Sequence, residues 1–309
     1  MKEMNSTIKN ILGNAYPVIQ NNIFRMIGTI SPKTLASIQY QRGFGRKIDW
    51  NDPKDINEKI NWLKFNTDTT AWTTLADKFR VREHVERMGL GNMLVQLYGH
   101  WDDAEDINWD ALPRQFIMKT NNGSGEVFIC KDKAKIDTAA WTATFKTQLA
   151  MKFGRSMGEP HYNRIKPCII AEELLDCRKQ PIPSSSLIDY KIWSFDGKPA
   201  YIWACYNRTH ASVQVALYDL DWNFHPEYSI STPHYILADK PMPKPKSLDQ
   251  MLHAAAVLSK GFPELRVDLY EVDDKPYFGE LTFSSAAGFN DFYTPEFLRI
   301  LGDLTILNK

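Results

Sequence analysis

The sequence predicts an α+β fold in which antiparallel β-hairpins alternate with helices. One hairpin over residues 190–206 turns at Asp196-Gly197, a dipeptide typical of a two-residue loop. Another hairpin over residues 267–283 turns at residues 273–275. Hairpins join strands antiparallel, whereas a doubly wound sheet needs parallel strands with helical crossovers. The pattern therefore favours α+β over α/β.

The composition limits the classes of function. The chain has 309 residues, which suggests two domains or one large one at about 150 residues per domain. Lys+Arg and Asp+Glu are both 37, and this zero net charge argues against a nucleic-acid partner. No run approaches the roughly 18 apolar residues of a membrane helix, and no secretory signal is recognisable. The four cysteines show no CxxC spacing, so we expect free thiols in the cytoplasm.

The remaining elements follow in chain order. The first fifty residues predict short helices with a break at Ser31-Pro32. Residues 11–30 would form a helix packed on its own domain or resting on a partner or membrane surface. Further helices are expected over residues 57–63, 74–88 (ended by Gly89), 137–153 and 248–258, and strands over 116–119, 127–130 and the apolar start of 167–175.

The last hairpin carries a pair of carboxylates. With a three-residue loop, Asp268 lies directly opposite Glu280, and opposite residues share a face of the sheet. Two such carboxylates repel each other unless a cation lies between them, and Mg²⁺ prefers carboxylate oxygen. Arg266 and Thr282 fall on the same face. A solvated surface hairpin is the alternative, and a two-residue loop would place the two acids on opposite faces.

A glycine-tipped hairpin is the second candidate. Gly123 and Gly125 permit positive φ, so successive backbone N–H groups could hold phosphate oxygens. Lys119, at the end of the incoming strand, could reach the same phosphates. The loop is not a Walker A motif, and such a turn is often only a turn. Glu172 and Glu173 follow an apolar strand and form either a solvated loop or a polar edge for an adenine amino group.

Taken in order, these pieces resemble the ATP-grasp superfamily, and in particular the TupA-like ATP-grasp family of teichuronopeptide and polysaccharide biosynthesis. The resemblance covers about residues 30–309. It rests on residues 57–64 (Asn-Glu-Lys-Ile-Asn-Trp-Leu-Lys), 75–78 (Leu-Ala-Asp-Lys), 121–125 (Asn-Asn-Gly-Ser-Gly), 130–133 (Cys-Lys-Asp-Lys), 189–191 (Asp-Tyr-Lys), 218–222 (Tyr-Asp-Leu-Asp-Trp), 266–270 (Arg-Val-Asp-Leu-Tyr) and 278–283 (Phe-Gly-Glu-Leu-Thr-Phe).

The resemblance implies that ATP lies between two antiparallel β-rich subdomains. The resemblance implies that Lys78 and Lys119 contact the phosphates of ATP, and that Gly123, Ser124 and Gly125 form a flap over these phosphates. It also implies that the adenine edge is contacted by Glu172 and Leu174, with Glu173 as an alternative, and that Asp189 approaches the ribose. It assigns Mg²⁺ to Asp268, Glu280 and Thr282, and the reacting groups to Arg266, Lys191 and Arg208.

The resemblance also divides the chain and shows one departure. A helical N-terminal region is expected over residues 1–70, a first subdomain with the flap over 71–170 and a second with the metal site over 171–309. The family pattern Glu-x-Asn is Glu280-Leu281-Thr282 here. A hydroxyl is a poorer cation ligand than an amide carbonyl, so one metal or two stays open.

The implied activity is that of an ATP-dependent carboxylate–amine ligase working through an acyl phosphate. Its cofactors would be ATP and Mg²⁺. Its partners would be a small-molecule or glycan carboxylate, such as a uronic acid or peptide precursor, and an amine such as an amino acid. Peripheral contact with membrane-bound polysaccharide machinery is a further expectation, and nucleic acid is not. The alternatives are a phosphotransferase acting on a sugar hydroxyl and a non-catalytic ATP-binding scaffold.

Overall fold

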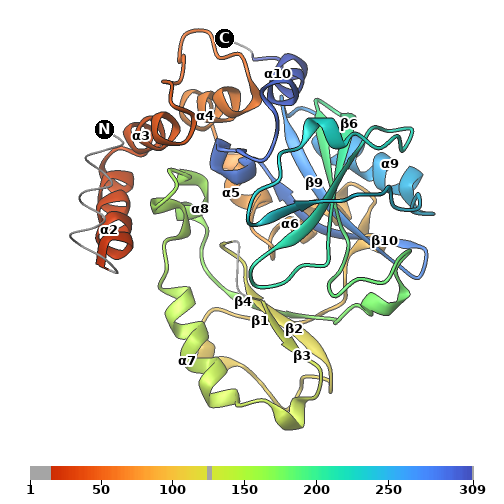
Figure 1. The fold of residues 1–309 in the computed structure, drawn as a ribbon. Helices are drawn as coiled ribbons and strands as arrows, with labels where there is room; N and C mark the ends of the chain where they lie inside the picture. Colours follow the sequence, from red (N-terminus) through yellow and green to blue (C-terminus); the bar gives the residue numbers. More distant parts are fainter. Residues whose placement is uncertain (1–14, 124–126, 308–309) are drawn as a thin grey trace.

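The computed structural model describes residues 15–123 and 127–307, which form two β-sheets with helices packed around them (Figure 1). The helices are α2 (Ala15–Ile30), α3 (Pro32–Phe44), α4 (Ile56–Asn66), α5 (Thr70–Leu75), α6 (Val81–Arg87), α7 (Thr138–Leu149), α8 (Pro160–Arg164), α9 (Leu248–Ser259) and α10 (Pro295–Leu304). The combination of helices with largely antiparallel sheets confirms the α+β class.

The first sheet has four antiparallel strands in the order β1-β4-β2-β3. Its strands are β1 (Leu97–Trp101), β2 (Phe116–Thr120), β3 (Phe128–Cys130) and β4 (Ile169–Glu172). Phe116, Met118 and Ile169 are fully buried in one core with Phe145 of α7. The strands expected near residues 116–119, 127–130 and 169 are confirmed, whereas β1 lies in a stretch for which no strand was expected.

The second sheet has six strands in the order β10-β9-β5-β6-β7-β8. They are β5 (Asp189–Phe195), β6 (Lys198–Tyr206), β7 (Val213–Tyr218), β8 (Tyr235–Leu237), β9 (Leu265–Val272) and β10 (Lys275–Thr282), and only β7 and β8 pair parallel. On one face, Ile192 and Val267 pack in a core with Met251 of α9. On the other, Trp193 packs in a core with residues of α4 and α10 such as Ile60.

The β9–β10 hairpin has a shorter loop than expected, but Asp268 still pairs with Glu280. The loop has two residues, Asp273 and Asp274, with φ of 58° and 60°, so the three-residue loop was wrong. A β-bulge at Gly279 then inserts one unpaired residue and shifts the register by one. Glu280 therefore does pair with Asp268, as expected, and both point to one face of the sheet.

The helix expected over residues 74–88 is wrong, because the chain breaks between α5 and α6. The Asp77 carboxylate accepts hydrogen bonds from the backbone N–H of Phe79 (2.9 Å) and Arg80 (3.0 Å), which begins a new helical segment. Gly89, with φ of 77°, ends α6 as expected. The helix expected over residues 137–153 begins after Asp137 but ends at Leu149.

The N-terminal helices confirm the expected break. Ser31 accepts a hydrogen bond from the backbone N–H of Thr34, and Pro32 takes the first position of α3. The helices expected over residues 57–63 and 248–258 are also confirmed, as α4 and α9. Across the ranges that the structure describes, no helix has the length and apolarity that crossing a membrane requires.

Candidate active site

Strands β10, β9 and β5 are neighbours in the second sheet, and their charged side chains lie side by side across these strands. Asp268 of β9 lies opposite Glu280 of β10 on one side and opposite Lys191 of β5 on the other. The Lys191 Nζ is 2.5 Å from the Asp268 Oδ2. We call the polar residues of β10, β9 and β5 on this face the charged seam: Glu280, Thr282, Arg266, Asp268, Asp189 and Lys191. The register of the strands, rather than chance surface contact, brings them together.

Arg266 anchors the charged seam. Its guanidinium makes a bidentate contact with the carboxylate of Asp268, at 2.7 Å and 2.8 Å. It also donates hydrogen bonds to the hydroxyls of Ser285 (2.7 Å) and Thr282 (3.1 Å). Burial alone would lower the pKa of Arg266, but the charge and hydrogen bonds of Asp268, together with the charges of Glu280 and Asp189, raise it above its ordinary value. Arg266 is therefore a fixed, permanently charged group.

Lys78 connects the charged seam to the glycine-tipped loop. Its Nζ donates to the backbone carbonyl of Gly123 at 2.6 Å and lies 3.1 Å from the Glu280 Oε2. Burial alone would raise the pKa of Glu280, but Lys78, Lys191 and Arg266 together lower it well below its ordinary value. Glu280 is therefore a carboxylate near neutral pH, and its side chain retains 29% exposure.

Lys191 bridges two carboxylates. Its Nζ lies 2.5 Å from an oxygen of Asp189 and 2.5 Å from one of Asp268. Burial alone would lower the pKa of Lys191, but these two charges raise it above its ordinary value. Burial raises the pKa of Asp189, against the opposing effect of Lys191. The second carboxylate oxygen of Asp189 is buried without a hydrogen-bond partner among the described residues.

The carboxylate pair suits a cation that takes most of its ligands from elsewhere. Within the described residues, no three His, Cys, Asp or Glu side chains gather into a cage. Mg²⁺ is commonly held by one or two carboxylates together with phosphate and water oxygens. Glu280 keeps 29% side-chain exposure, whereas both oxygens of Asp268 are bound by Arg266 and Lys191. The Thr282 hydroxyl accepts from Arg266 and lies 3.4 Å from a Glu280 oxygen, to which it donates. Thr282 thus orients the Glu280 carboxylate.

A smaller charged group lies on the first sheet. The two carboxylate oxygens of Glu172 contact Lys119 Nζ at 2.8 Å and Arg82 Nη1 at 2.9 Å. We call Lys119, Glu172 and Arg82 the Glu172 triad. Glu173 follows as an exposed residue whose N–H donates to the carbonyl of Gln96 at 2.9 Å. The Glu172 carboxylate therefore fixes the position of Lys119.

Arg208 is an expected site residue that lies apart from the charged seam and the Glu172 triad. Ser124 and Gly125 are not among the described residues, so only Gly123 represents the glycine-tipped loop. Arg208 lies exposed in the loop after β6, where its backbone N–H and carbonyl bond to Ser186 and Ser185. Arg208 is not part of the network of ion pairs that the described residues form at the charged seam.

Tyr270 was not expected as a site residue. It follows Arg266 and Asp268 at alternate positions of β9, so it shares their face. Burial, followed by the charges of Asp189, Glu280, Asp268 and Glu172, raises its pKa well above the ordinary value. A Cβ on Gly279 would lie 3.0 Å from its ring. The alternation of β9 was the available sequence signal, and it extends two positions beyond Asp268.

A loop that follows β10 is held by one face of α4. Ala286, Ala287 and Gly288 of the turn η7 (Ser285–Gly288) all have positive φ. Asn61 Nδ2 donates to the carbonyl of Gly288 (3.0 Å), and Lys64 Nζ donates to that of Ala287 (2.7 Å). On the same face, Asn57 Oδ1 accepts from the N–H and Nδ2 of Asn290, and its Nδ2 donates to the Asn290 carbonyl (3.2 Å). The helix thus positions Ser285, which contacts Arg266.

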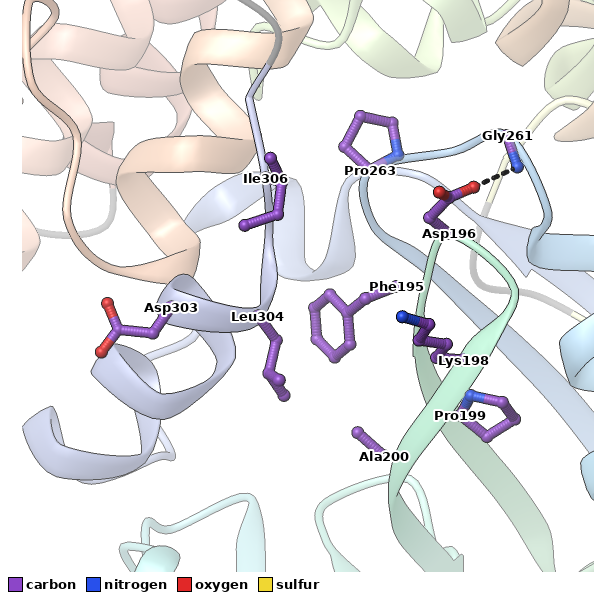
Figure 2. Close-up of a pocket in the computed structure, with 10 residues that line it drawn as sticks. All are labelled: Phe195, Asp196, Lys198, Pro199, Ala200, Gly261, Pro263, Asp303, Leu304 and Ile306. Carbon is purple, nitrogen blue, oxygen red and sulfur yellow. Dashed lines mark hydrogen bonds between the residues drawn. The ribbon is translucent and has the colours of Figure 1, made fainter.

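A cavity of about 570 Å³ lies elsewhere, between the tip of the β5–β6 hairpin and the segment after α10 (Figure 2). Phe195 and Pro263 line it together with Leu304 and Ile306. Figure 2 shows the Asp196 carboxylate bonded to the Gly261 N–H at its edge, at 2.8 Å. None of the expected site residues lines this cavity, so we do not assign the nucleotide to it.

Two largely antiparallel sheets thus carry the expected motifs, with Lys78 between the glycine-tipped loop and the Glu280 carboxylate. The chain belongs to the TupA-like ATP-grasp family, whose sequence profile matches residues 58–306. The resemblance stated from the sequence is thereby confirmed. A search of curated proteins finds no match.

Several solved structures are similar to the chain. The D-alanine–D-alanine ligase from Bacillus anthracis, complexed with ATP, is 15% identical with a TM-score of 0.45, over 77% of this chain and 67% of that one. The ATP-grasp ligase PsnB with a minimal precursor is 13% identical at 0.41, over 78% and 62%. Phosphoribosylglycinamide synthetase from Anaerococcus prevotii is 13% identical at 0.35, over 74% and 48%. At these TM-scores the likenesses carry no argument about function.

Proposed function

We propose that the protein is an ATP-dependent ligase that activates a carboxylate as an acyl phosphate and joins it to an amine. The observation that carries the proposal is the continuous charged network from the Gly123 carbonyl through Lys78 and Glu280 to the charged seam. It joins Lys78, from the segment between α5 and α6, to carboxylate, arginine and lysine side chains of the second sheet. Phosphoryl transfer depends mainly on positioning and on charge stabilisation by such groups.

The lysines are proposed to hold the phosphates of ATP. Lys78 has 14% and Lys119 has 22% exposure of the side chain, so both ammonium groups are accessible to a ligand. A phosphate oxygen would compete with Glu280 for Lys78, whereas Lys119 would bind a phosphate oxygen while Glu172 holds it in position. Glu280 released in this way becomes a ligand for Mg²⁺ beside Asp268. Bound Mg²⁺ would supply neutralisation of charge on the phosphoryl oxygens.

The other contacts of the nucleotide are proposed from the same geometry. The Glu172 carboxylate is committed to Lys119 and Arg82, so we assign the adenine edge to Glu173 and Leu174. One carboxylate oxygen of Asp189 has no hydrogen-bond partner within residues 15–123 and 127–307, which suits a ribose hydroxyl. The flap of Gly123, Ser124 and Gly125 stays part of the proposal as the element that covers the phosphates and excludes water.

The reaction has two steps in this proposal. An oxygen of the substrate carboxylate attacks the γ-phosphorus, and the bond from that phosphorus to ADP breaks. The amine, as the free base, then attacks the acyl carbon, phosphate leaves with its electron pair, and the amine loses a proton to solvent. Arg266 is fixed beside the reacting groups and would stabilise the acyl phosphate. Lys191 would do so from the phosphate side, and we give Arg208 no role unless its loop moves toward the charged seam.

The substrates are proposed from the family resemblance alone. The acid would be a uronic acid, glycan or peptide precursor of cell-surface polysaccharide synthesis, and the amine an amino acid. We also propose that the protein is cytoplasmic, depends on Mg²⁺ and contacts membrane-bound polysaccharide enzymes. We further propose that the subdomain boundaries lie near residues 70 and 170.

The test is product analysis by mass spectrometry. The full chain is incubated with ATP, Mg²⁺ and pooled uronic acids and amino acids, and ADP, phosphate and the mass of an amide are sought. Lys78→Met should abolish product, whereas Lys246→Met, which alters an exposed ion pair with Asp274, should not. A phosphorylated sugar without free phosphate would indicate a phosphotransferase. Tight ATP binding without ADP release from any acid would indicate a scaffold.

A further inference from the structure

Helix α2 exposes a row of aliphatic side chains. Ile19, Ile23, Met26 and Ile30 are spaced by four, three and four residues, so they lie along one face of the helix. Their exposed fractions are 41%, 45%, 59% and 78%. We call these four residues the α2 stripe. Single exposed aliphatic residues are ordinary, but an aligned row of them indicates a surface that binds a protein partner or a membrane.

The orientation of the α2 stripe is fixed by the opposite side of the helix. A Cβ on Gly28 would lie 1.8 Å from the carbonyl oxygen of Arg155 and 2.9 Å from the Leu35 side chain. Gly28 thus permits the close approach of α2 to α3 and to the turn η4 (Phe153–Arg155). Figure 1 shows α2 at the margin of the molecule, beyond α3. The stripe is therefore presented outward by a packed helix.

The charge around the α2 stripe is of one sign. Residues 15–48 contain five Lys and Arg and no Asp or Glu, in a chain whose net charge is zero. The rest of the chain therefore carries a net charge of −5. Arg46 is paired with Asp55 and Glu58, whereas Arg25, Lys33, Arg42 and Lys47 are exposed side chains. The molecule is thus electrically polarised, with its positive end at the helices that carry the stripe.

We propose that α2 docks the protein on the surface of an anionic lipid bilayer, lying flat with the α2 stripe in the acyl boundary. An apolar helical face beside basic residues is the pattern of interfacial helices. The basic end is attracted to anionic headgroups, and the acidic remainder is repelled, which orients the molecule. Pairing of two copies through this face would bring like charges together, so a bilayer is the better partner. The inference does not depend on the ligase chemistry.

The experiment is sedimentation of the full chain with vesicles of phosphatidylcholine, with and without 30 mol% phosphatidylglycerol. We expect binding to the anionic vesicles that weakens as salt is raised. The double variant Ile23→Gln/Ile30→Gln, at two exposed positions, should lower the bound-to-free ratio by at least about fivefold. Arg25→Glu/Lys33→Glu should lower it by a similar factor.

The matched control is Ile129→Gln, which changes an exposed isoleucine (53%) on β3, remote from α2. It should bind as the unaltered protein does, and circular dichroism should confirm that all variants are folded. Binding that is absent, independent of phosphatidylglycerol, or equal in the control and the stripe variants would overturn the proposal. So would a protein dimer in analytical ultracentrifugation that the stripe variants abolish.

Discussion

The charged seam and the Glu172 triad use similar residues but differ in how they are held. In the charged seam, Asp268 is 1% exposed and is contacted by Arg266 and Lys191 from register positions fixed by three paired strands. In the Glu172 triad, the cations keep 15% and 22% exposure and come from a helix and a strand. The centre of the charged seam is therefore closed to solvent, whereas the Glu172 triad holds in position a lysine whose side chain stays partly exposed.

The largest expected effect is that of Asp268→Ala. It leaves two buried cations, Arg266 and Lys191, without their common partner, and breaking a buried pair in this way costs about 3–5 kcal/mol. Urea unfolding monitored by tryptophan fluorescence would measure the loss. Asp303→Ala, which breaks an exposed pair with Arg299, should change stability by less than about 1 kcal/mol. Equal effects of the two variants would contradict the account of the seam.

Gly279→Ala tests the bulge that aligns the charged seam. The new Cβ would lie 2.9 Å from the carbonyl oxygen of Asp268 and 3.0 Å from the ring of Tyr270, so backbone or ring must shift. Such overpacking costs about 1–3 kcal/mol. Activity should fall as well, because Glu280 depends on this register. The control is Gly43→Ala, since the Cβ there meets nothing within 4 Å and a helical position gains from alanine. An unchanged Gly279→Ala protein would show that the bulge is dispensable.

Glu172→Gln probes the Glu172 triad and is expected to cost less, about 1–2 kcal/mol, because both cations retain access to water. Its functional effect should be weaker binding of an ATP analogue, because Lys119 loses the partner that positions it. Titration calorimetry measures this affinity. Glu105→Gln, which weakens an exposed pair with Lys146, serves as the control. A stability loss as large as that of Asp268→Ala would erase the distinction between the two groups.

Glu159→Gln tests a buried polar cluster that lies outside both groups. Burial raises the pKa of Glu159 to about 7, against the opposing charge of Lys64. The folded protein therefore binds a proton more tightly than the unfolded chain, whose ordinary value is 4.5. Stability should fall as pH rises from about 4.5 to about 7, and Glu159→Gln should remove that fall.

Glu280 should show the opposite behaviour, because its pKa is lowered in the folded protein. Its contribution to stability is present above the unfolded value of 4.5 and is lost as pH falls through the folded one. Urea midpoints measured between about pH 2 and 8 compare the two glutamates. A Glu159→Gln variant that retains the slope of the unaltered protein would refute the assignment.

The sequence predicted local patterns well and longer-range geometry less well. Asp196-Gly197 fixed a turn, and Gly89 ended a helix, because both depend on backbone conformation alone. The alignment of Asp268 with Glu280 was expected from a loop length that proved wrong and is restored by the bulge at Gly279, which no turn signal announces. The strands β1, β7 and β8 and the helix α10 were not expected.

The site was only partly predictable for the same reason. Alternation along β9 placed Arg266 and Asp268 together, since the period of a strand is two residues. Contacts from other elements, such as Arg82 on Glu172 and Asn61 on the Gly288 carbonyl, depend on tertiary packing that no local spacing reveals. The resemblance to the family supplied the order of the motifs, whereas the contacts of each side chain became known only from the structure.

The most direct test of the central claim is titration calorimetry of a non-hydrolysable ATP analogue with Mg²⁺. The account predicts that Lys78→Met weakens binding at least about tenfold, equal to about 1.4 kcal/mol, because Lys78 joins the glycine-tipped loop to the charged seam. Lys246→Met, which alters an exposed ion pair with Asp274 in the loop of the β9–β10 hairpin, should leave the affinity unchanged. Equal affinities of the unaltered protein and Lys78→Met would contradict the claim that this network holds the nucleotide.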